Sequence, residues 1–272
     1  MSVSWAGYLR RRRRSRGAAA FLAVVTAAVV GLLGWFFLRG QFELGDGSAG
    51  PSTARVYDWG WMKPIPVLHA VPDASARSVL DALPVAAKES SRGYERMQFG
   101  QAWADADRNG CDTRNDILRR DLSAVTFTAS SARTLCRVAS GELWDPYTGR
   151  HIPFERGQGS SQTVQIDHVV ALAEAWKSGA DHLSSQERQT LANDPLNLLA
   201  VDGATNQSKS AQDASTWLPD NKAFRCHYVA RQVSVKYSYG LSVSAQERDA
   251  MRRVLDGCPE QNIIGRPGVP GR

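Results

Sequence analysis

The chain has 272 residues, which is enough for a short tail, a membrane segment and one globular domain with its own core. It carries 33 Lys and Arg against 27 Asp and Glu, but seven of the arginines precede residue 40, where there is no acidic residue. The remainder therefore holds 26 basic and 27 acidic side chains, a net charge of −1. Overall charge is thus no indication of nucleic-acid binding, and any attraction for phosphate has to come from a local patch.

The N-terminal segment is predicted to direct the chain across a membrane. Residues 1–17 form a basic cytoplasmic tail, and residues 18–38 are uncharged and mostly apolar, long enough to span roughly 30 Å as a transmembrane helix. This pattern predicts a single-pass anchor with an extracytoplasmic C-terminal domain. A cleaved signal peptide is the alternative, and the protein is then secreted; the length of the apolar run and the lack of a nearby A-x-A site favour the anchor.

Residues 39–91 are predicted to be a linker followed by an N-terminal extension of uncertain structure. Gly, Ser and Pro are frequent up to residue 56, and a short helix is expected to begin at Asp73 and end before Pro84.

The four cysteines all lie in the exported part, and their even number predicts two disulfides. Three pairings are open. Cys111–Cys136 and Cys226–Cys258 are favoured because each pair closes a modest loop. A zinc site is the alternative, although no C-x-x-C pair is present.

Residues 92–260 are predicted to form one α+β domain, in which a small hairpin is wrapped by helices, and residues 261–272 a flexible tail. Ser184 with Glu187 and Ser244 with Glu247 have the spacing of capping boxes, so a helix is expected after each serine, the second ending at Gly257. Apolar spacing and turn residues predict helices at 111–122, 171–177, 206–209 and 220–238, strands at 125–128, 135–138, 163–168 and 197–201, and turns at 141–149 and 202–203.

A group of polar residues follows the two central strands. Asp167 and His168 end the first strand, Asn197 begins the second, and Asn206 and Lys209 lie three residues apart on the next helix, hence on one face. A neutral histidine can act as a general base near pH 7, and a carboxylate with an amide oxygen can bind a hard divalent ion. Adjacent side chains point to opposite faces of a strand, so a bend at Asp167-His168 is required to bring both to one site.

These residues, with the segments G-C-D-T-R-N-D-I-L-R-R-D-L, W-D-P-Y-T-G, Q-I-D-H-V-V-A-L-A-E-A-W-K-S-G-A, N-D-P-L-N-L-L-A-V and N-Q-S-K, resemble the HNH endonuclease superfamily. The stretch is most similar to the DUF1524 group of secreted or membrane-anchored actinobacterial nucleases. The resemblance covers roughly residues 105–220 and implies a ββα-metal hairpin and helix, also called a His-Me finger. Two positions depart from the common pattern: Ala171 replaces a frequent proline, and Asn206 a frequent histidine.

The resemblance implies an extracytoplasmic, metal-dependent endonuclease acting on DNA, with RNA as a second substrate class. His168 is expected to be the general base, and Asp167 and Asn206 to hold one divalent ion, Mg²⁺ before Mn²⁺ or Zn²⁺. Asn197 is expected to brace the histidine loop. Lys209 and Arg114 are the candidates for phosphate binding. No obligate protein partner is evident.

Two other functions stay open. The first is a catalytically silent module that binds nucleic acid or a polymer at the cell surface. The second is a phosphodiesterase acting on another cell-surface polymer, which the nearly neutral exported part keeps open because nuclease grooves are usually basic.

Overall fold

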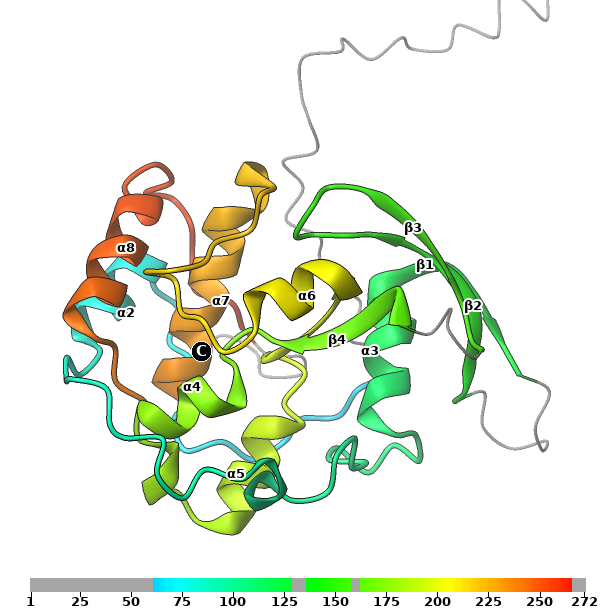
Figure 1. The fold of residues 1–272 in the computed structure, drawn as a ribbon, viewed down its shortest axis with the longest axis horizontal. Helices are drawn as coiled ribbons and strands as arrows, with labels where there is room; N and C mark the ends of the chain where they lie inside the picture. The colour runs from blue at the N-terminus through cyan, green and yellow to red at the C-terminus, as the bar shows by residue number, and fades with distance from the viewer. Residues whose placement is uncertain (1–60, 129–135, 158–161, 266–272) are drawn as a thin grey trace, which may run out of the picture. The chain divides into compact units, whose positions relative to one another are not determined.

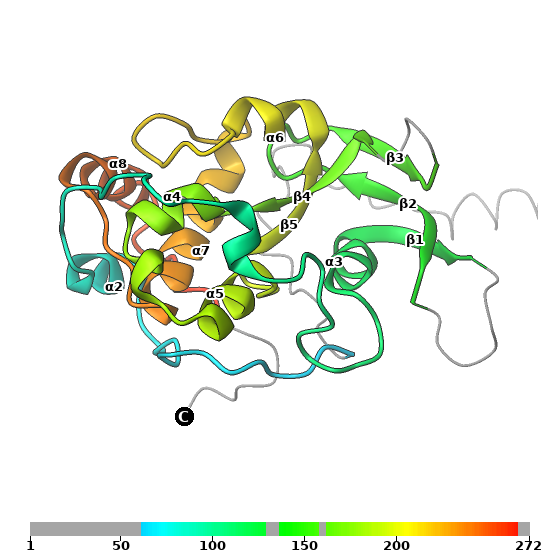
Figure 2. The same ribbon diagram turned by 60° about the horizontal axis from the view of Figure 1, so that its bottom comes forward.

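The computed structural model describes residues 61–128, 136–157 and 162–265. These residues form a mixed α+β fold with two small antiparallel sheets, in which strands β4 and β5 lie between a helical half and a second sheet (Figures 1 and 2). The predicted basic tail and transmembrane helix, residues 1–38, lie outside the described residues. Among the described helices, none has the length and apolar character needed to cross a membrane.

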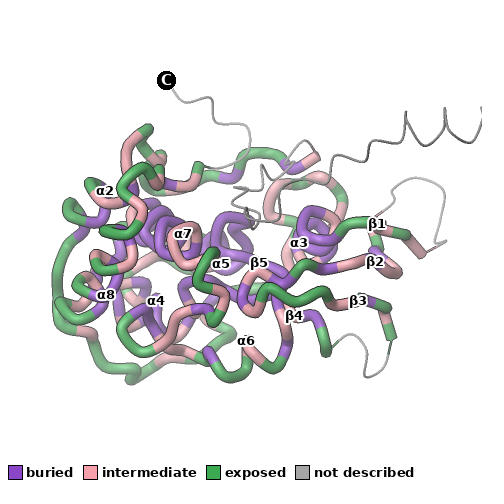
Figure 3. The backbone as a smooth tube through the Cα atoms, turned by 90° about the horizontal axis from the view of Figure 1, so that it is seen from above, coloured by how far each residue is buried: buried purple, intermediate pink, exposed green. Residues whose placement is uncertain are grey.

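The helical half is built around α7, Arg225–Ser238, which is buried along most of its length (Figure 3). It packs against α2, Ala76–Ala82, and α8, Ala245–Leu255. The capping box predicted for α8 is confirmed, and the helix ends at Leu255. The expected start of α2 at Asp73 is wrong, because the side chain of Ser75 accepts the hydrogen bond that caps the helix. Part of the predicted extension thus contributes to the core.

The central unit has the order strand, strand, helix. β4, Val164–His168, pairs with β5, Leu198–Asp202, and α6, Gly203–Lys209, follows directly. Asp202 caps α6 through its side chain, so the predicted turn there is a helix start. Two helices fill the connection between the strands, α4 at Leu172–Lys177 and α5 at Ser185–Ala192, and α5 begins with the predicted capping box.

A second sheet lies beyond α3, Thr113–Asp121, with strand order β1, β2, β3 (Figure 2). Its strands are β1 at Leu122–Phe127, β2 at Val138–Trp144 and β3 at His151–Glu155. Part of β2 covers residues predicted to be turns, and β3 is absent from the prediction. Pro153 weakens any strand signal there, but β3 is an edge strand, where a missing N–H is tolerated.

Helix α3 is attached to the central unit by buried polar groups. The Oδ2 atom of Asp121 accepts a hydrogen bond from the backbone N–H of Ala200 on β5, and Arg120 donates to the carbonyl oxygens of Pro195 and Leu198. These bonds satisfy backbone groups next to β5 and fix α3 against it. Three 3₁₀ helices are also described, at Arg96–Phe99, Ala180–His182 and Lys222–Phe224.

Both favoured disulfides, Cys111–Cys136 and Cys226–Cys258, are present. All four cysteines form disulfides, so no free thiol is available to bind zinc.

Candidate active site

The last two residues of β4 line a polar pocket. Asp167 and His168 are both largely buried, and they share with Asn206 the wall of a cavity of about 270 Å³. Both residues pair with β5 in regular register, Asp167 with Leu199 and His168 with Leu198, so the strand is continuous where a bend was expected. Both nevertheless line the pocket, which brings together residues from β4 and α6 as the order of the elements predicts.

The imidazole of His168 is held in one orientation. Its Nε2 atom lies 2.9 Å from the carbonyl oxygen of Ala192, which can only accept a hydrogen bond, so Nε2 carries the proton and Nδ1 keeps a lone pair. The ring also stacks on Trp103, with a centroid distance of 6.3 Å. Burial lowers the pKa of His168 to about 3, which keeps the imidazole neutral at neutral pH. A neutral ring with a free lone pair is what a general base requires.

Asn197 fixes the loop that follows the histidine. It is fully buried, its Oδ1 accepts from the N–H of Val170 at 2.8 Å, and its Nδ2 donates to the carbonyl of Val170 at 3.2 Å. Its own carbonyl accepts from the N–H of Val169. These contacts are of the kind that the predicted bracing role needs.

Asp167 is engaged on both oxygens. Lys209 Nζ donates to Oδ1 at 3.0 Å, and the hydroxyl of Tyr147 donates to Oδ2 at 2.5 Å. Burial raises the pKa of Asp167, and the Lys209 ammonium opposes that shift. Tyr147 is positioned by the turn after β2, where Asp145 accepts hydrogen bonds from Thr148 and from the N–H of Asp202. The W-D-P-Y-T-G segment thus serves the site by placing one hydroxyl on Asp167.

The expected contact between Lys209 and a substrate phosphate does not fit this arrangement. Lys209 is fully buried, and besides Asp167 its ammonium bonds the carbonyl oxygen of His168 at 2.9 Å. The ammonium group of Lys209 therefore binds the Asp167 carboxylate and a backbone carbonyl inside the protein, and it does not face the pocket. The same lysine supports the position of both candidate catalytic residues from behind.

The side chains of Asp167 and Asn206 present oxygen atoms at the pocket. Asp167 offers carboxylate oxygens, each with a further lone pair, and Asn206 donates through Nδ2 to Gln165 at 2.9 Å, which leaves its oxygen as the remaining group of the amide. Oxygen donors of this kind suit Mg²⁺ or Mn²⁺ better than zinc, which prefers nitrogen and sulfur.

Arg114 does not line the pocket. Its guanidinium lies 6.0 Å from the centre of the Trp103 ring, a cation–π contact that supports the stack on His168. A different arginine, Arg96, lies where Arg114 was expected. Arg96 is exposed, and it lines the polar pocket and also a neighbouring one. No motif in the sequence indicated Arg96, because only the 3₁₀ helix at 96–99 brings it close to β4.

The neighbouring pocket, of about 300 Å³, is mostly apolar and shares His168 with the first. Its walls include Met97, Phe99 and Trp103, of which Met97 is 86% exposed. Trp103 has a φ of +58°, a strained conformation for a bulky residue and one that tends to occur at functional sites. A charged cavity and an apolar cavity therefore meet at the imidazole.

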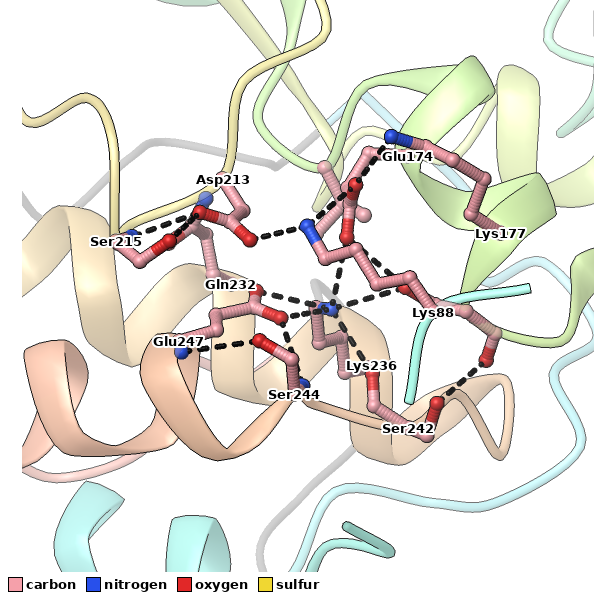
Figure 4. Close-up of polar contacts among 12 residues, drawn as sticks. Lys88, Glu174, Lys177, Asp213, Ser215, Gln232, Lys236, Ser242, Ser244 and Glu247 are labelled. Carbon is pink, nitrogen blue, oxygen red and sulfur yellow. Dashed lines mark hydrogen bonds and ion pairs between the residues drawn. The ribbon is translucent and has the colours of Figure 1, made fainter. Parts of the chain in front are cut away.

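Three other buried carboxylates, from Glu174, Asp213 and Glu247, lie close enough together to suggest a metal centre. Figure 4 shows that lysines reach into this cluster instead. Lys88 forms ion pairs with Glu174, at 2.9 Å, and with Asp213, while Lys236 lies 2.9 Å from Glu247. The ammonium groups compensate the carboxylates, so the cluster joins α4, α7 and α8 as a structural network.

Comparison with known proteins gives two results. Residues 112–254, more than half of the chain, match the family described as GmrSD restriction endonucleases, C-terminal domain. A protein of Arthroderma benhamiae (strain ATCC MYA-4681 / CBS 112371), named "Uncharacterized secreted protein", is 35% identical over 198 residues, which cover 72% of this chain and 91% of the relative. The matched region includes both strands of the central unit and α6.

Proposed function

The chain belongs to the family of GmrSD restriction endonuclease C-terminal domains, and we propose that it is an exported, metal-dependent endonuclease with His168 as general base. The observation that carries the proposal is the bond from His168 Nε2 to the Ala192 carbonyl, since it leaves Nδ1 as the basic nitrogen of a neutral ring in a polar pocket. The proposal places the protein with HNH enzymes of the DUF1524 type.

The proton moves first to the imidazole. Nδ1 of His168 accepts a proton from the attacking water while the water oxygen bonds to phosphorus and the bond from phosphorus to the leaving sugar oxygen breaks. The leaving oxygen takes its proton from solvent, and the imidazolium is stabilised by the anionic phosphate beside it. That anion opposes the effect of burial on the imidazole, so the basicity of His168 rises when substrate is bound. Asn197 holds the loop and Trp103 the ring plane, which keeps the imidazole aimed during the transfer.

Asp167 and Asn206 would hold one divalent ion, for which Mg²⁺ is the first candidate. When bound, such an ion neutralises charge that develops on the phosphate oxygens. Lys209 and Tyr147 orient the Asp167 carboxylate by bonding its two oxygens, so the carboxylate cannot rotate away from the pocket.

Arg96 and the apolar pocket account for substrate binding. Arg96 lies at the junction of the two cavities, where its guanidinium can bind a phosphate next to the scissile one. Trp103 and the largely exposed Met97 offer a surface against which a nucleobase can pack, and packing of this kind tolerates any base. We therefore expect weak sequence preference, with DNA as the first substrate and RNA as the second.

Export is supported by the two disulfides and by the word "secreted" in the name of the relative. Anchoring through residues 18–38 remains part of the proposal.

The test uses the purified full-length protein with supercoiled plasmid and with single-stranded RNA, each in Mg²⁺, Mn²⁺ or EDTA. We expect metal-dependent cleavage by the wild type and by His182→Ala, whose histidine is exposed and does not line the pocket. His168→Ala is expected to reduce the rate by about 10²–10⁴-fold with an unchanged circular dichroism spectrum. Wild-type cleavage by a folded His168→Ala protein, or no cleavage of either substrate under any metal, contradicts the proposal.

A matched arginine pair tests the substrate site. Arg96→Ala is expected to raise KM and to reduce the dependence of binding on salt, because a phosphate contact is lost. Arg92→Ala removes an exposed arginine four residues away that lines neither pocket, and it is expected to leave both quantities unchanged. Equal effects of the two substitutions would show that general surface charge is responsible.

A further inference from the structure

The loop that leads into α3 has an unusual spacing of oxygen-bearing side chains. Asp105, Asp107 and Asn109 alternate, Gly110 follows, and Asp116 stands eleven residues after Asp105. This is the pattern D-x-D-x-N-G-x₅-D, which differs from the calcium loop of EF-hand proteins only in having Asp for Glu at the twelfth position. The pattern lies outside the two pockets, so the proposed nuclease site does not account for it.

The backbone of the loop curls around Asp105. Its Oδ1 accepts from the N–H of Asn109 at 3.0 Å and its Oδ2 from the N–H of Gly110 at 2.9 Å. Gly110 has a φ of +96°, which the sharp turn at the sixth position of a calcium loop requires and which only glycine adopts without strain. Helix α3 begins at Thr113, so Asp116 lies in its first turn.

The carboxylate of Asp116 is buried and has no cationic partner among the described residues. It is only 4% exposed, and its Oδ2 accepts one bond, from Asn109 Nδ2 at 3.0 Å. Its Oδ1 receives no hydrogen bond from any described residue, and no described Lys, Arg or His forms an ion pair with Asp105, Asp107 or Asp116. A buried carboxylate without a cationic partner is costly, which points to a cation as its partner.

The negative charges of Asp107, Asp105 and Asp112 lie near Asp116. The carboxylates of Asp105, Asp107 and Asp116 lie farther apart than ligands around one ion, so a bound cation would draw them together. The Asn109 amide lies between two of these groups, since the same Nδ2 also donates to Asp107 Oδ2 at 3.1 Å. The oxygen of that amide accepts from the N–H of Cys111 at 2.8 Å, so the amide has to give up this bond when it turns its oxygen toward a cation.

We propose that residues 105–116 form a calcium-binding site separate from the catalytic pocket. The ligands are the side-chain oxygens of Asp105, Asp107, Asn109 and Asp116 with the backbone carbonyl oxygen of Cys111, which holds the seventh position of the loop. Ca²⁺ is favoured over Mg²⁺ because a flexible loop of five protein oxygens completed by water suits six to eight ligands better than a strict octahedron.

Calcium would fix the wall of the apolar pocket. The loop begins two residues after Trp103, which stacks on His168, and Asp107 accepts from the N–H of Lys63, which ties in the preceding segment. The Cys111–Cys136 disulfide holds the other side of the loop. Extracellular calcium is thus expected to order the segment that carries Trp103, while the site itself is independent of whether the protein cuts nucleic acid.

The test measures calcium binding by the full-length protein after bound calcium has been removed with EGTA. Binding is measured by isothermal titration calorimetry and by the shift in thermal melting. We expect one Ca²⁺ per chain, with a Kd of about 10⁻⁴–10⁻³ M as in other extracellular calcium modules. In 10 mM CaCl₂ the Tm is expected to rise by roughly 3–10 °C, and by much less in 10 mM MgCl₂.

Two isosteric variants and two controls locate the effect. Asp116→Asn and Asp105→Asn are expected to weaken calcium binding at least about tenfold and to abolish the Tm shift, and Asp116→Asn should melt no lower than wild type in EGTA because it removes buried charge. Asp112→Asn, at a position that does not bind metal in the loop, and Asn206→Ala, in the catalytic pocket, are expected to keep the shift. No calcium-dependent heat or melting shift in the wild type, or an equal shift in both ligand variants, would overturn the proposal.

Discussion

Replacing Lys209 by methionine separates its structural role from a substrate-binding one. The substitution keeps the length of the side chain and removes the ammonium that bonds Asp167 at 3.0 Å and the His168 carbonyl at 2.9 Å. Asp167 is then left 5% exposed, with the Tyr147 hydroxyl and the backbone N–H of His168 as partners but no cation. Breaking a buried ion pair on one side costs about 3–5 kcal/mol, so we expect a loss of that size in the free energy of unfolding.

The free energy of unfolding is measured by urea denaturation, with tryptophan fluorescence as the readout. Lys222→Met, which removes an exposed lysine, is the matched control and should change the unfolding free energy by less than about 0.5 kcal/mol. Adding Asp167→Asn to Lys209→Met is expected to recover part of the loss, because the buried charge without a partner disappears. A loss below about 1 kcal/mol in Lys209→Met, together with a raised KM, would refute this reasoning and restore Lys209 as a phosphate ligand.

Three further predictions concern His227, the Cys226–Cys258 disulfide and Asn197. Burial lowers the pKa of His227 to about 3, so between about pH 6.5 and 3 the unfolded state binds its proton preferentially, and the free energy of unfolding falls as pH decreases. In acid titrations of stability His227→Phe should show a shallower loss than wild type, and an unchanged slope would contradict the assignment. Joint replacement of Cys226 and Cys258 by serine opens a loop with a sequence separation of 32 residues and should cost about 3–4 kcal/mol in urea unfolding; a loss under 1 kcal/mol would count against it. Asn197→Ala leaves the N–H of Val170 without its acceptor, so a loss of about 1–3 kcal/mol should accompany a fall in kcat at nearly constant KM, whereas a KM effect alone would argue against a bracing role.

Much of the local structure was predictable because its determinants are close in sequence. The capping boxes at Ser184 and Ser244 start helices, as their spacing predicts, and the strands that carry Asp167 and Asn197 form where apolar residues run between turns. The three-stranded sheet was harder to predict. Pro153 lowers the strand signal of β3, and only pairing with β2 at the sheet edge makes that segment extended.

The candidate site also has a part that the sequence predicts and a part that it does not. The order of Asp167, His168, Asn197 and Asn206 along a strand, strand and helix was sufficient to predict that three of them share one pocket and the fourth supports it. Nothing in the sequence separates a lysine that reaches a substrate from one that is buried, because a flexible side chain can turn either way. The packing of α6 on β4 decided that Lys209 turns inward.

The sequence by itself determined the two central strands, the principal helices, the number of disulfides and the identity of the candidate base, because each depends on periodicity, capping or residue type within a short span. Only the tertiary structure decided which distant groups meet there: Arg96 and Trp103 beside His168, Tyr147 on Asp167, and a buried Asp116 facing the acidic loop. These contacts join residues far apart in the chain. Their energy comes from burial and from pairing of polar groups away from water, which exist only once the segments have packed.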